Sequence, residues 1–266
     1  MEPVAAHYKP SLFNASKYVT YLDYFKEYIA CKDFKSLAAS LKYVVTHKLP
    51  REDYQTSSRM GDFHIRKGTT DFQFINHAYE RKVKKYIEDN LDSFDVFIDV
   101  GACIGEYCIW LGKLGKRCIA IEPVNFEAVR RNVKLNRLED SVQVFACGLG
   151  SKKERVYFNI PTGIPSSSYM DKDAGKTPNV DIETFDELWK QFNLPPNSRV
   201  LVKLDVEGME TEVIAGAREF INSHKNLTFI YEHFETDNYQ NDKALLAIAD
   251  FRFADIDGVN RLAVKS

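Results

Sequence analysis

The sequence predicts an α/β fold in which a doubly wound, mostly parallel sheet is covered by helices on both faces. After residue 90, strand and helix patterns alternate along the chain, as they do in folds built from βαβ units. The strand segments "FDVFIDV", "RCIAIE" and "RVLVKLDV" are nearly continuous runs of apolar residues. Such strands are buried on both faces, which indicates parallel pairing between two layers of helix.

The N-terminal part has a different pattern. From Asn14 to about His47, apolar residues recur at helical spacing with charged residues between them, which predicts two short amphipathic helices. The apolar positions are Leu22, Phe25, Tyr28, Ile29, Phe34, Leu37, Leu41 and Val44. We expect this stripe to pack on the main domain, and a grip on a partner or on a membrane surface is the alternative. The chain is therefore divided into a helical cap, residues 1–60, and a main domain, residues 61–266.

The remaining elements follow in order. "KLPREDYQTSSRMGD" predicts a loop, "DFHIRKG" a short strand, and the segment from Asp71 to Asn90 a helix that leads into the sheet. Further helices are predicted over 106–114, 125–136, 209–223 and 243–249. Further strands are predicted at "VQVFAC", "NLTFIYEHF", "FRFADID" and "NRLAVKS", with "RVYFNI" and "NVDIET" as excursions from the main sheet.

Composition narrows the class of protein. The chain has 266 residues, 44% of them hydrophobic, which is enough to bury a full core. Its net charge of -2 and the lack of a basic cluster predict no nucleic-acid partner. No run approaches the roughly 18 apolar residues that span a bilayer, and the N-terminus lacks a basic region followed by an apolar one, so we expect no signal peptide. The five cysteines, an odd number without a Cys-x-x-Cys pair, are expected to be buried thiols of a cytoplasmic protein: Cys31, Cys103, Cys108, Cys118 and Cys147.

The turn after the first main strand carries two glycines. Gly101 and Gly105 allow a sharp turn and a close approach of a ligand to the backbone, and the next helix points its free N–H groups at that place. A nucleotide or nucleoside site is expected there. A dinucleotide site would need glycine where Cys103 and Glu106 stand, and we expect the Glu106 carboxylate to face a pyrophosphate unfavourably, which argues against NAD.

Two carboxylates end the first two strands. Asp99 suits a ligand with a cationic amino or sulfonium group, as S-adenosylmethionine has, better than one with two phosphates. Glu122 is expected to accept hydrogen bonds from both ribose hydroxyls of a nucleoside. A solvated position before Pro123 is the alternative for Glu122.

Three segments in order resemble the successive motifs of the FkbM family of S-adenosylmethionine-dependent methyltransferases: "FIDVGACIGEYCIWLGKLG", "IAIEPVNFEAVRRNVKLN" and "VLVKLDVEGMETEVIAGAREFI". The resemblance covers about residues 64 to 266, because "RKGTTDFQFI" also resembles a stretch that precedes the domain in many members. It implies a class I methyltransferase, Rossmann-like fold with a terminal antiparallel hairpin, S-adenosyl-L-methionine as cofactor, and O-methylation. Cys103 departs from the family, which usually has asparagine there.

The resemblance also implies site residues. Those expected to bind the cofactor are Asp99, Gly101, Ala102, Cys103, Gly105, Tyr107, Glu122, Pro123, Cys147, Gly148 and Asp205. The segment "PTGIPSSSYM" would suit a lid over the substrate, with a plain surface loop as the alternative.

Methyl transfer to oxygen requires a base near the acceptor. The strand ends "LDVEGME" and "YEHFE" supply Asp205, Glu232 and His233, which we predict as the catalytic residues. His233 is the expected base, because imidazole accepts a proton near neutral pH, and a purely structural histidine is the alternative. We assign no metal site, but the same three side chains would also suit a divalent cation, Mg²⁺ or Mn²⁺.

The resemblance implies an acceptor hydroxyl on a glycan, a glycolipid or a polyketide. Aromatic and acidic residues expected near the pocket favour a sugar, and they are Tyr169, Tyr231, Phe234, Tyr239, Glu207, Glu232 and Asp237. We therefore expect a hydroxyl of a cell-surface polysaccharide or a sugar-linked precursor. The alternatives are a small-molecule hydroxyl and a catalytically silent cofactor-binding or scaffold protein. A homodimer through the N-terminal helices is a further expectation.

Overall fold

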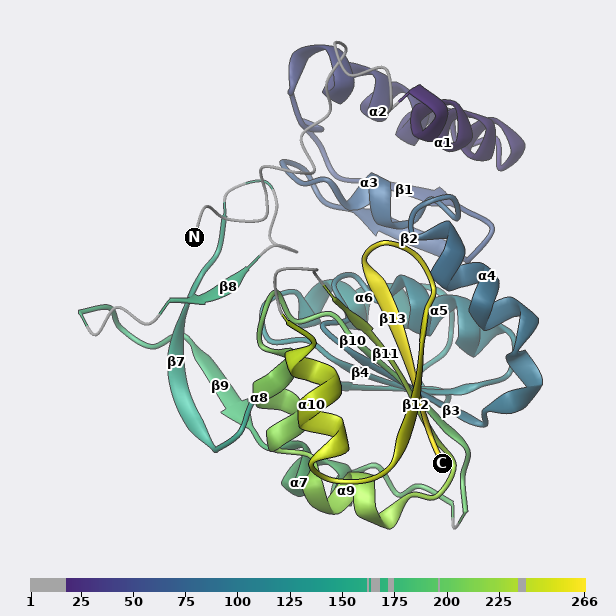
Figure 1. The fold of residues 1–266 in the computed structure, drawn as a ribbon. Coiled ribbons are helices and arrows are strands. Elements are labelled where there is room, and N and C mark those ends of the chain that lie inside the picture. Colours follow the sequence, from purple (N-terminus) through teal and green to yellow (C-terminus); the bar gives the residue numbers. More distant parts are fainter. Residues whose placement is uncertain (1–17, 162, 164–167, 172–174, 196, 234–237) are drawn as a thin grey trace.

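A seven-stranded sheet forms the centre of the protein (Figure 1). The computed structural model describes residues 18–161, 163, 168–171, 175–195, 197–233 and 238–266. The strands lie in the order β12-β13-β11-β10-β3-β4-β5. Their bounds are β3 Val96–Val100, β4 Arg117–Ile121, β5 Val142–Phe145, β10 Val200–Leu204, β11 Leu227–Glu232, β12 Phe251–Asp255 and β13 Asn260–Lys265. The central pairs are parallel, whereas β13 runs antiparallel to β11 and β12, so the predicted sheet with a terminal hairpin is confirmed.

Helices cover both faces of this sheet (Figure 1). One layer contains α4 Arg81–Asp89, α5 Glu106–Lys113 and α6 Phe126–Leu135, and the other contains α7 Phe185–Leu188, α8 Glu210–Ala215, α9 Arg218–Ser223 and α10 Gln240–Leu246. The described residues also form two one-turn 3-10 helices, η3 Leu91–Ser93 and η5 Trp189–Gln191.

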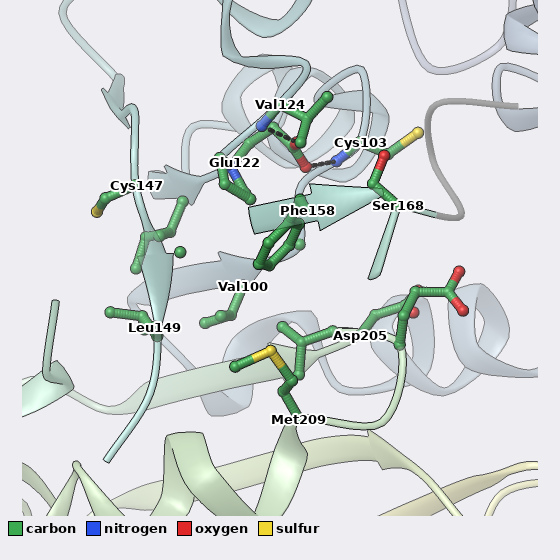
Figure 2. A pocket seen from close by; sticks show the side chains of 16 residues that line it. Val100, Cys103, Glu122, Val124, Cys147, Leu149, Phe158, Ser168, Asp205 and Met209 are labelled. Atoms are coloured by element: carbon green, nitrogen blue, oxygen red, sulfur yellow. Dashed lines mark hydrogen bonds between the residues drawn. The ribbon is translucent and has the colours of Figure 1, made fainter. Parts of the chain in front are cut away.

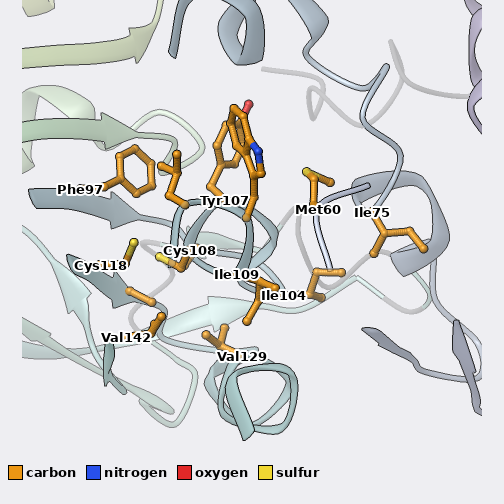
Figure 3. Close-up of a cluster of buried hydrophobic side chains, with 14 of the residues drawn as sticks. Met60, Ile75, Phe97, Ile104, Tyr107, Cys108, Ile109, Cys118, Val129 and Val142 are labelled. Atoms are coloured by element: carbon orange, nitrogen blue, oxygen red, sulfur yellow. The ribbon is translucent and has the colours of Figure 1, made fainter. Parts of the chain in front are cut away.

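Side chains of each strand alternate between two hydrophobic clusters. Phe97 and Cys118 pack against Tyr107 and other residues of α5 (Figure 3), whereas Ile98 and Ile119 belong to the cluster on the opposite face. Asp99 follows Phe97 by two positions, so it points toward the α5 side. This parity decides where several predicted site residues lie.

Two helices predicted as continuous are each broken in two. The segment 71–90 forms α3 Asp71–Phe74 and α4, because the Asn76 side chain accepts a hydrogen bond from the Ala78 N–H and donates one to the Tyr24 carbonyl. The segment 209–223 is interrupted at Gly216, where a Cβ atom would lie 2.1 Å from the Gly150 carbonyl oxygen. The last predicted helix begins three positions earlier than expected, at Gln240.

The predicted loop over 48–62 contains a strand. β1 Tyr54–Ser57 pairs antiparallel with β2 Asp62–Ile65, which is the predicted "DFHIRKG" strand. Hydrogen bonds between the backbones of Ser58 and Gly61 close the hairpin. β1 was not predicted because its residues are mostly polar and show no apolar strand pattern.

The predicted excursions form a separate four-stranded sheet of order β6-β9-β7-β8. Its strands are β6 Gly148–Leu149, β7 Glu154–Asn159, β8 Tyr169–Asp171 and β9 Val180–Glu183. This small sheet stands beside the carboxyl ends of the main strands (Figure 1).

The two predicted N-terminal helices are confirmed as α1 Tyr18–Ala30 and α2 Phe34–Thr46. Tyr28 and Tyr43 are buried, and the Tyr28 hydroxyl donates to the Phe72 carbonyl at 2.7 Å. The expectation that the whole apolar stripe packs inward is wrong, because four of its residues are exposed: Leu22, Ile29, Phe34 and Leu41. A domain boundary at residue 60 stays a prediction.

Two sequence expectations concern the whole chain. All five cysteines are free thiols, and three of them are buried, whereas Cys31 and Cys103 are partly exposed. Across the part of the chain that the structure describes, no helix combines the length and the hydropathy needed to cross a bilayer.

Candidate functional site

A cleft lies at the carboxyl ends of β3, β4 and β10, beside the small sheet (Figure 2). The space between its lining residues, including the part that opens to bulk solvent, is about 530 Å³. Seven predicted cofactor residues line it: Gly101, Cys103, Glu122, Pro123, Cys147, Gly148 and Asp205. Further walls come from residues that the sequence analysis did not assign to the cofactor: Val100, Ile121, Val124, Leu149, Phe158, Ser168, Val206, Glu207 and Met209.

The glycine turn forms the floor between β3 and β10. Gly101 has φ +89°, and a Cβ atom there would lie 1.9 Å from the Asp205 carbonyl oxygen. The Asp205 N–H also donates to the Val100 carbonyl at 2.9 Å. The absence of a side chain at Gly101 therefore allows the loop that carries Asp205 to lie directly against the turn.

Glu122 holds three backbone N–H groups together. Its Oε2 accepts from the Cys103 N–H at 3.0 Å, and its Oε1 accepts from the Val124 N–H at 2.8 Å (Figure 2). The same Oε1 accepts from the Asn125 N–H at 2.8 Å. Glu122 is buried and still lines the cleft. Since an ionised carboxylate oxygen has about two acceptor positions, only Oε2 keeps one for a ligand. The carboxylate thus clamps the glycine turn to the start of α6, which the sequence analysis did not anticipate.

We expect Glu122→Ala to lower the free energy of unfolding by about 2 kcal/mol, because three buried or partly buried N–H groups lose their acceptor. Glu122→Gln should lower the free energy of unfolding less, because its amide oxygen can still accept from the N–H groups of Val124 and Asn125. Its NH₂ group would face the Cys103 N–H, and two donors cannot form a hydrogen bond. Urea titration of both variants measures the difference. Glu127→Gln, at an exposed position on α6, is the control, and an unchanged Glu122→Ala would contradict the clamp.

Four predicted cofactor residues do not line the cleft: Asp99, Ala102, Gly105 and Tyr107. Asp99 is buried on the α5 side of the sheet, where strand parity directs it. Gly105 packs against α6, where a Cβ atom would lie 2.9 Å from Val129 Cγ1. The Tyr107 hydroxyl donates to Glu80 Oε2 at 2.7 Å inside the core. The structure thus leaves the direct cofactor contacts of these residues as predictions.

A buried charge cluster lies behind the turn. Lys203, also on the α5 side of β10, pairs with Asp205 at 2.7 Å and with Glu80 at 3.7 Å, and its ammonium lies 5.1 Å from the Tyr107 ring centre. Burial lowers the pKa of Lys203, but the carboxylates of Asp205, Glu80 and Asp99 raise it more, so the net shift is well upward. Lys203 therefore remains a cation, and it holds Asp205 at the edge of the cleft.

Burial also raises the pKa of several acids in this cluster. The pKa of Asp99 rises to about 7 through burial and the nearby Asp205 carboxylate, against the opposing effect of Lys203. The pKa of Glu106 rises to about 8 through burial and Asp99, and Lys84 opposes this rise. Burial and Asp205 raise the pKa of Glu232 to about 9.

Glu106 does not face the cleft. It is buried beside Lys84, and its Oε2 has no hydrogen-bond partner among the residues that the structure describes. The expectation that this carboxylate would face a bound pyrophosphate is therefore wrong. The missing glycines at positions 103 and 106 alone disfavour a dinucleotide.

We expect Glu106→Gln to stabilise the protein at neutral pH. The unfolded chain releases this proton near pH 4.5 and the folded chain holds it to about pH 8, so the free energy of unfolding falls as the pH rises through that window. Glutamine does not titrate, so the variant should be about 2 kcal/mol more stable than the wild type at pH 7 and nearly equal at pH 4. Urea unfolding across this range tests it, and a constant difference from pH 4 to pH 8 would contradict it.

Of the predicted catalytic residues, only Asp205 lines the cleft. Glu232 and His233 lie at the end of the next strand, β11, and the His233 ring stacks on Tyr239 with 4.6 Å between ring centres. His233 Nδ1 is buried without a hydrogen-bond partner among the described residues. No group of three His, Cys, Asp or Glu side chains in the described part of the chain is arranged to hold a metal ion, so a divalent cation on Asp205, Glu232 and His233 is not supported.

The residues predicted to contact a sugar are dispersed. Glu207 lines the cleft, whereas Tyr231 is buried in the core and donates to Asp242 at 2.5 Å, so its expected place at the pocket mouth is wrong. Tyr169 begins β8, where its hydroxyl accepts from Asn159 at 2.7 Å. Phe234 and Asp237, and most of the predicted lid over 161–170, lie outside the described residues. The described Ser168, from the lid segment, lines the cleft.

The strand order, the reversed β13 and the glycine turn after β3 together define a class I methyltransferase fold of the Rossmann-like kind. The model of the methyltransferase FkbM domain matches residues 99–257, which is more than half of the chain. The chain therefore belongs to the FkbM methyltransferase family.

Three of the known structures that match this chain, each at a TM-score below 0.5, are as follows. Methyltransferase FkbM from Methylobacillus flagellatus KT is 20% identical with a TM-score of 0.45, covering 74% of this chain and 56% of that one. The Pyrococcus abyssi tRNA (uracil-54, C5)-methyltransferase, in complex with S-adenosyl-L-homocysteine, is 13% identical with a TM-score of 0.39, covering 80% and 44%. The T. thermophilus 16S rRNA N2 G1207 methyltransferase, in complex with AdoMet and guanosine, is 12% identical with a TM-score of 0.44, covering 81% and 50%.

The chain thus spans less than two thirds of the length of each of these three proteins. A search of curated protein sequences gave no match.

Proposed function

We propose that this protein is an S-adenosylmethionine-dependent O-methyltransferase. The observation that carries the proposal is the cleft that joins the Gly101 turn, Glu122 and Asp205 at three adjacent strand ends, in a chain of the FkbM family. Ligands of open parallel sheets bind at this edge. When bound, S-adenosylmethionine supplies the methyl group and its sulfonium leaving group.

The residues of the cleft fit such a cofactor. The bare backbone at Gly101 lets a ligand approach the turn, and Glu122 Oε2 has one acceptor position, which suits a ribose hydroxyl. Apolar side chains of Val124, Leu149 and Phe158 line the wall opposite Asp205 and offer contact to a planar base (Figure 2). We assign Asp205 to the amino group of the cofactor or to the acceptor hydroxyl, with Lys203 as its positioning residue.

We propose that side chains at the adjacent ends of β10 and β11 remove the proton from the acceptor hydroxyl. Asp205 borders the cleft, and burial together with the nearby Asp205 carboxylate raises the pKa of Glu232. His233, one residue further along, remains the proposed base. In this scheme the chain orients the hydroxyl and accepts its proton, and the reaction needs no other group from the protein.

For the acceptor we propose a sugar hydroxyl of a glycan or glycoconjugate. Support comes from the polar edge of the cleft, where Asp205, Glu207 and Ser168 offer groups that can bind hydroxyls. A polyketide would favour a more apolar edge. A catalytically silent binding protein is the rival, and it would bind the cofactor without turnover on any acceptor.

Titration calorimetry with S-adenosylmethionine, S-adenosylhomocysteine and NAD tests the cofactor. We expect both adenosyl ligands to bind and NAD not to bind, and Asp205→Asn should weaken binding by roughly tenfold through the loss of one charged contact. Binding of NAD alone would reverse the assignment.

Mass spectrometry of glycans from cells with and without the gene tests the acceptor. We expect one sugar to lose a mass equal to a methyl group in cells that lack the gene. A methyl loss from a lipid or small metabolite, with glycans unchanged, would overturn the sugar and leave the cofactor assignment standing.

A further inference from the structure

Helix α2 exposes a stripe of apolar side chains. Phe34, Ala38, Leu41 and Val45 recur at intervals of four, three and four residues, so they form one stripe along the helix, and all four are exposed. The buried side of the same helix consists of Ser36, Ser40, Tyr43 and Val44. The helix therefore carries apolar side chains on both its buried and its exposed sides, and a contiguous exposed stripe of large apolar residues is unlike an ordinary solvent-facing surface.

Helix α1 adds a second exposed apolar row. Figure 1 shows α1 and α2 side by side at one end of the molecule, separated from the main sheet by α3, β1 and β2. Besides Tyr18, six large aliphatic or aromatic side chains of the pair are between 45% and 68% exposed, and we call these six the N-terminal apolar surface: Val19, Leu22, Ile29, Phe34, Leu41 and Val45.

The unpaired charges around this surface are positive. Five exposed lysines accompany it, and none forms an ion pair with another residue in the described part of the chain: Lys26, Lys32, Lys35, Lys42 and Lys48. The acidic residues of the same segment are already engaged. Asp23 pairs with Arg81 at 3.4 Å, Glu27 pairs with Arg59 at 3.0 Å, and the buried Asp33 accepts the Ser36 N–H.

We propose that the N-terminal apolar surface binds the surface of an anionic lipid bilayer. A basic amphipathic helix with large apolar side chains lies in the interfacial layer of such a membrane, while its lysines contact the acidic headgroups. Lys35 and Lys42 directly follow Phe34 and Leu41, so they flank the stripe where headgroups would lie. Each helix has 13 residues, which suits a surface position rather than a span.

Charge favours a bilayer over a second copy of this chain. A symmetric contact through the N-terminal apolar surface would place the lysines of one copy near those of the other, and like charges oppose such a contact. A surface of acidic phospholipid would instead complement them. The inference concerns a different face from the cleft and does not depend on the proposed activity.

Sedimentation of the full chain with phospholipid vesicles tests the inference. We expect binding to vesicles of phosphatidylcholine with about 30% phosphatidylserine to be at least roughly tenfold tighter than to phosphatidylcholine alone, and to weaken as salt is added. The variant Lys35→Gln/Lys42→Gln should bind about 25-fold more weakly, from about fivefold for each lysine. The variant Phe34→Ser/Leu41→Ser/Val45→Ser should lose at least tenfold.

Leu246→Ser is the matched control, because Leu246 is an equally exposed leucine on α10, at another part of the molecule. It should bind vesicles as the wild type does, and thermal melts should show that all variants fold. Failure of the intact chain to bind the acidic vesicles would overturn the inference. Equal binding of the triple serine variant and the wild type to acidic vesicles would also overturn it. The same holds if the wild type is a dimer that the triple serine variant converts to a monomer, or if vesicle binding appears only after residues 1–17 are removed.

Discussion

Replacing Gly101 by alanine is expected to destabilise the protein by about 4 kcal/mol and to abolish cofactor binding. The added Cβ atom would lie 1.9 Å from the Asp205 carbonyl oxygen, and the backbone there has φ +89°, which alanine adopts only with strain. The contact is with backbone, so the turn and the Asp205 loop must separate. Both of them line the cleft, which is why binding should fail together with stability.

Gly115→Ala is the matched control for this experiment. Gly115 also has a left-handed backbone, with φ +81°, but no atom lies within 4 Å of the Cβ position. It should lose only about 1 kcal/mol from backbone strain. Urea unfolding of the two variants separates strain from the collision. An equal loss in both would show that the close approach of the Asp205 loop is not important.

Lys203→Met is expected to cost about 3 kcal/mol near pH 8, because it leaves the carboxylates of Asp205, Glu80 and Asp99 without their buried cation. The loss should shrink as the pH falls toward 5. Lys203 lowers the pKa of Asp99, so without it that acid would hold its proton to higher pH, and the free energy of unfolding would fall more steeply as the pH rises. Urea unfolding at several pH values measures both effects.

Lys190→Met is the control for the buried pair. Lys190 lies 2.7 Å from Glu187, the same separation as between Lys203 and Asp205, but both partners are exposed. Exposed pairs contribute about 0 to 1 kcal/mol, so this variant should be nearly as stable as the wild type. If the two methionine variants lost the same free energy of unfolding, Lys203 would not stabilise the buried carboxylates more than an exposed lysine stabilises its partner.

The sheet was predictable because its strands depend on a local pattern. Runs such as "FDVFIDV" need burial on both faces wherever they lie, and alternation with helices leaves few topologies. β1 was missed because Tyr54 to Ser57 carries mostly polar side chains, and its pairing with β2 depends on a turn closed by Ser58 and Gly61. The break at Gly216 was missed because its cause is a backbone segment far away in the sequence.

The site residues that were predicted correctly are those whose position follows from the ends of the parallel strands. Gly101, Glu122 and Asp205 come at strand ends, and parallel strands bring those ends to one edge, so all three line the cleft. Asp99 was placed at a strand end too, but it lies two positions before Gly101, and its side chain is buried on the α5 side of the sheet. Val124 and Met209 were missed because an apolar residue in a loop carries no sign of what it will face.

By itself, the sequence determined the alternating strands and helices of the main sheet, the glycine turn and the carboxylates that follow the strands, because each of these depends on residue type and local spacing. Only the tertiary structure decided which side chains share a neighbourhood. It buries Glu106 and Tyr107 behind the turn, gives Glu122 three backbone N–H groups to hold, and leaves Phe34 exposed on α2. Burial and charge pairing are properties of contacts between distant segments, and a local pattern does not encode them.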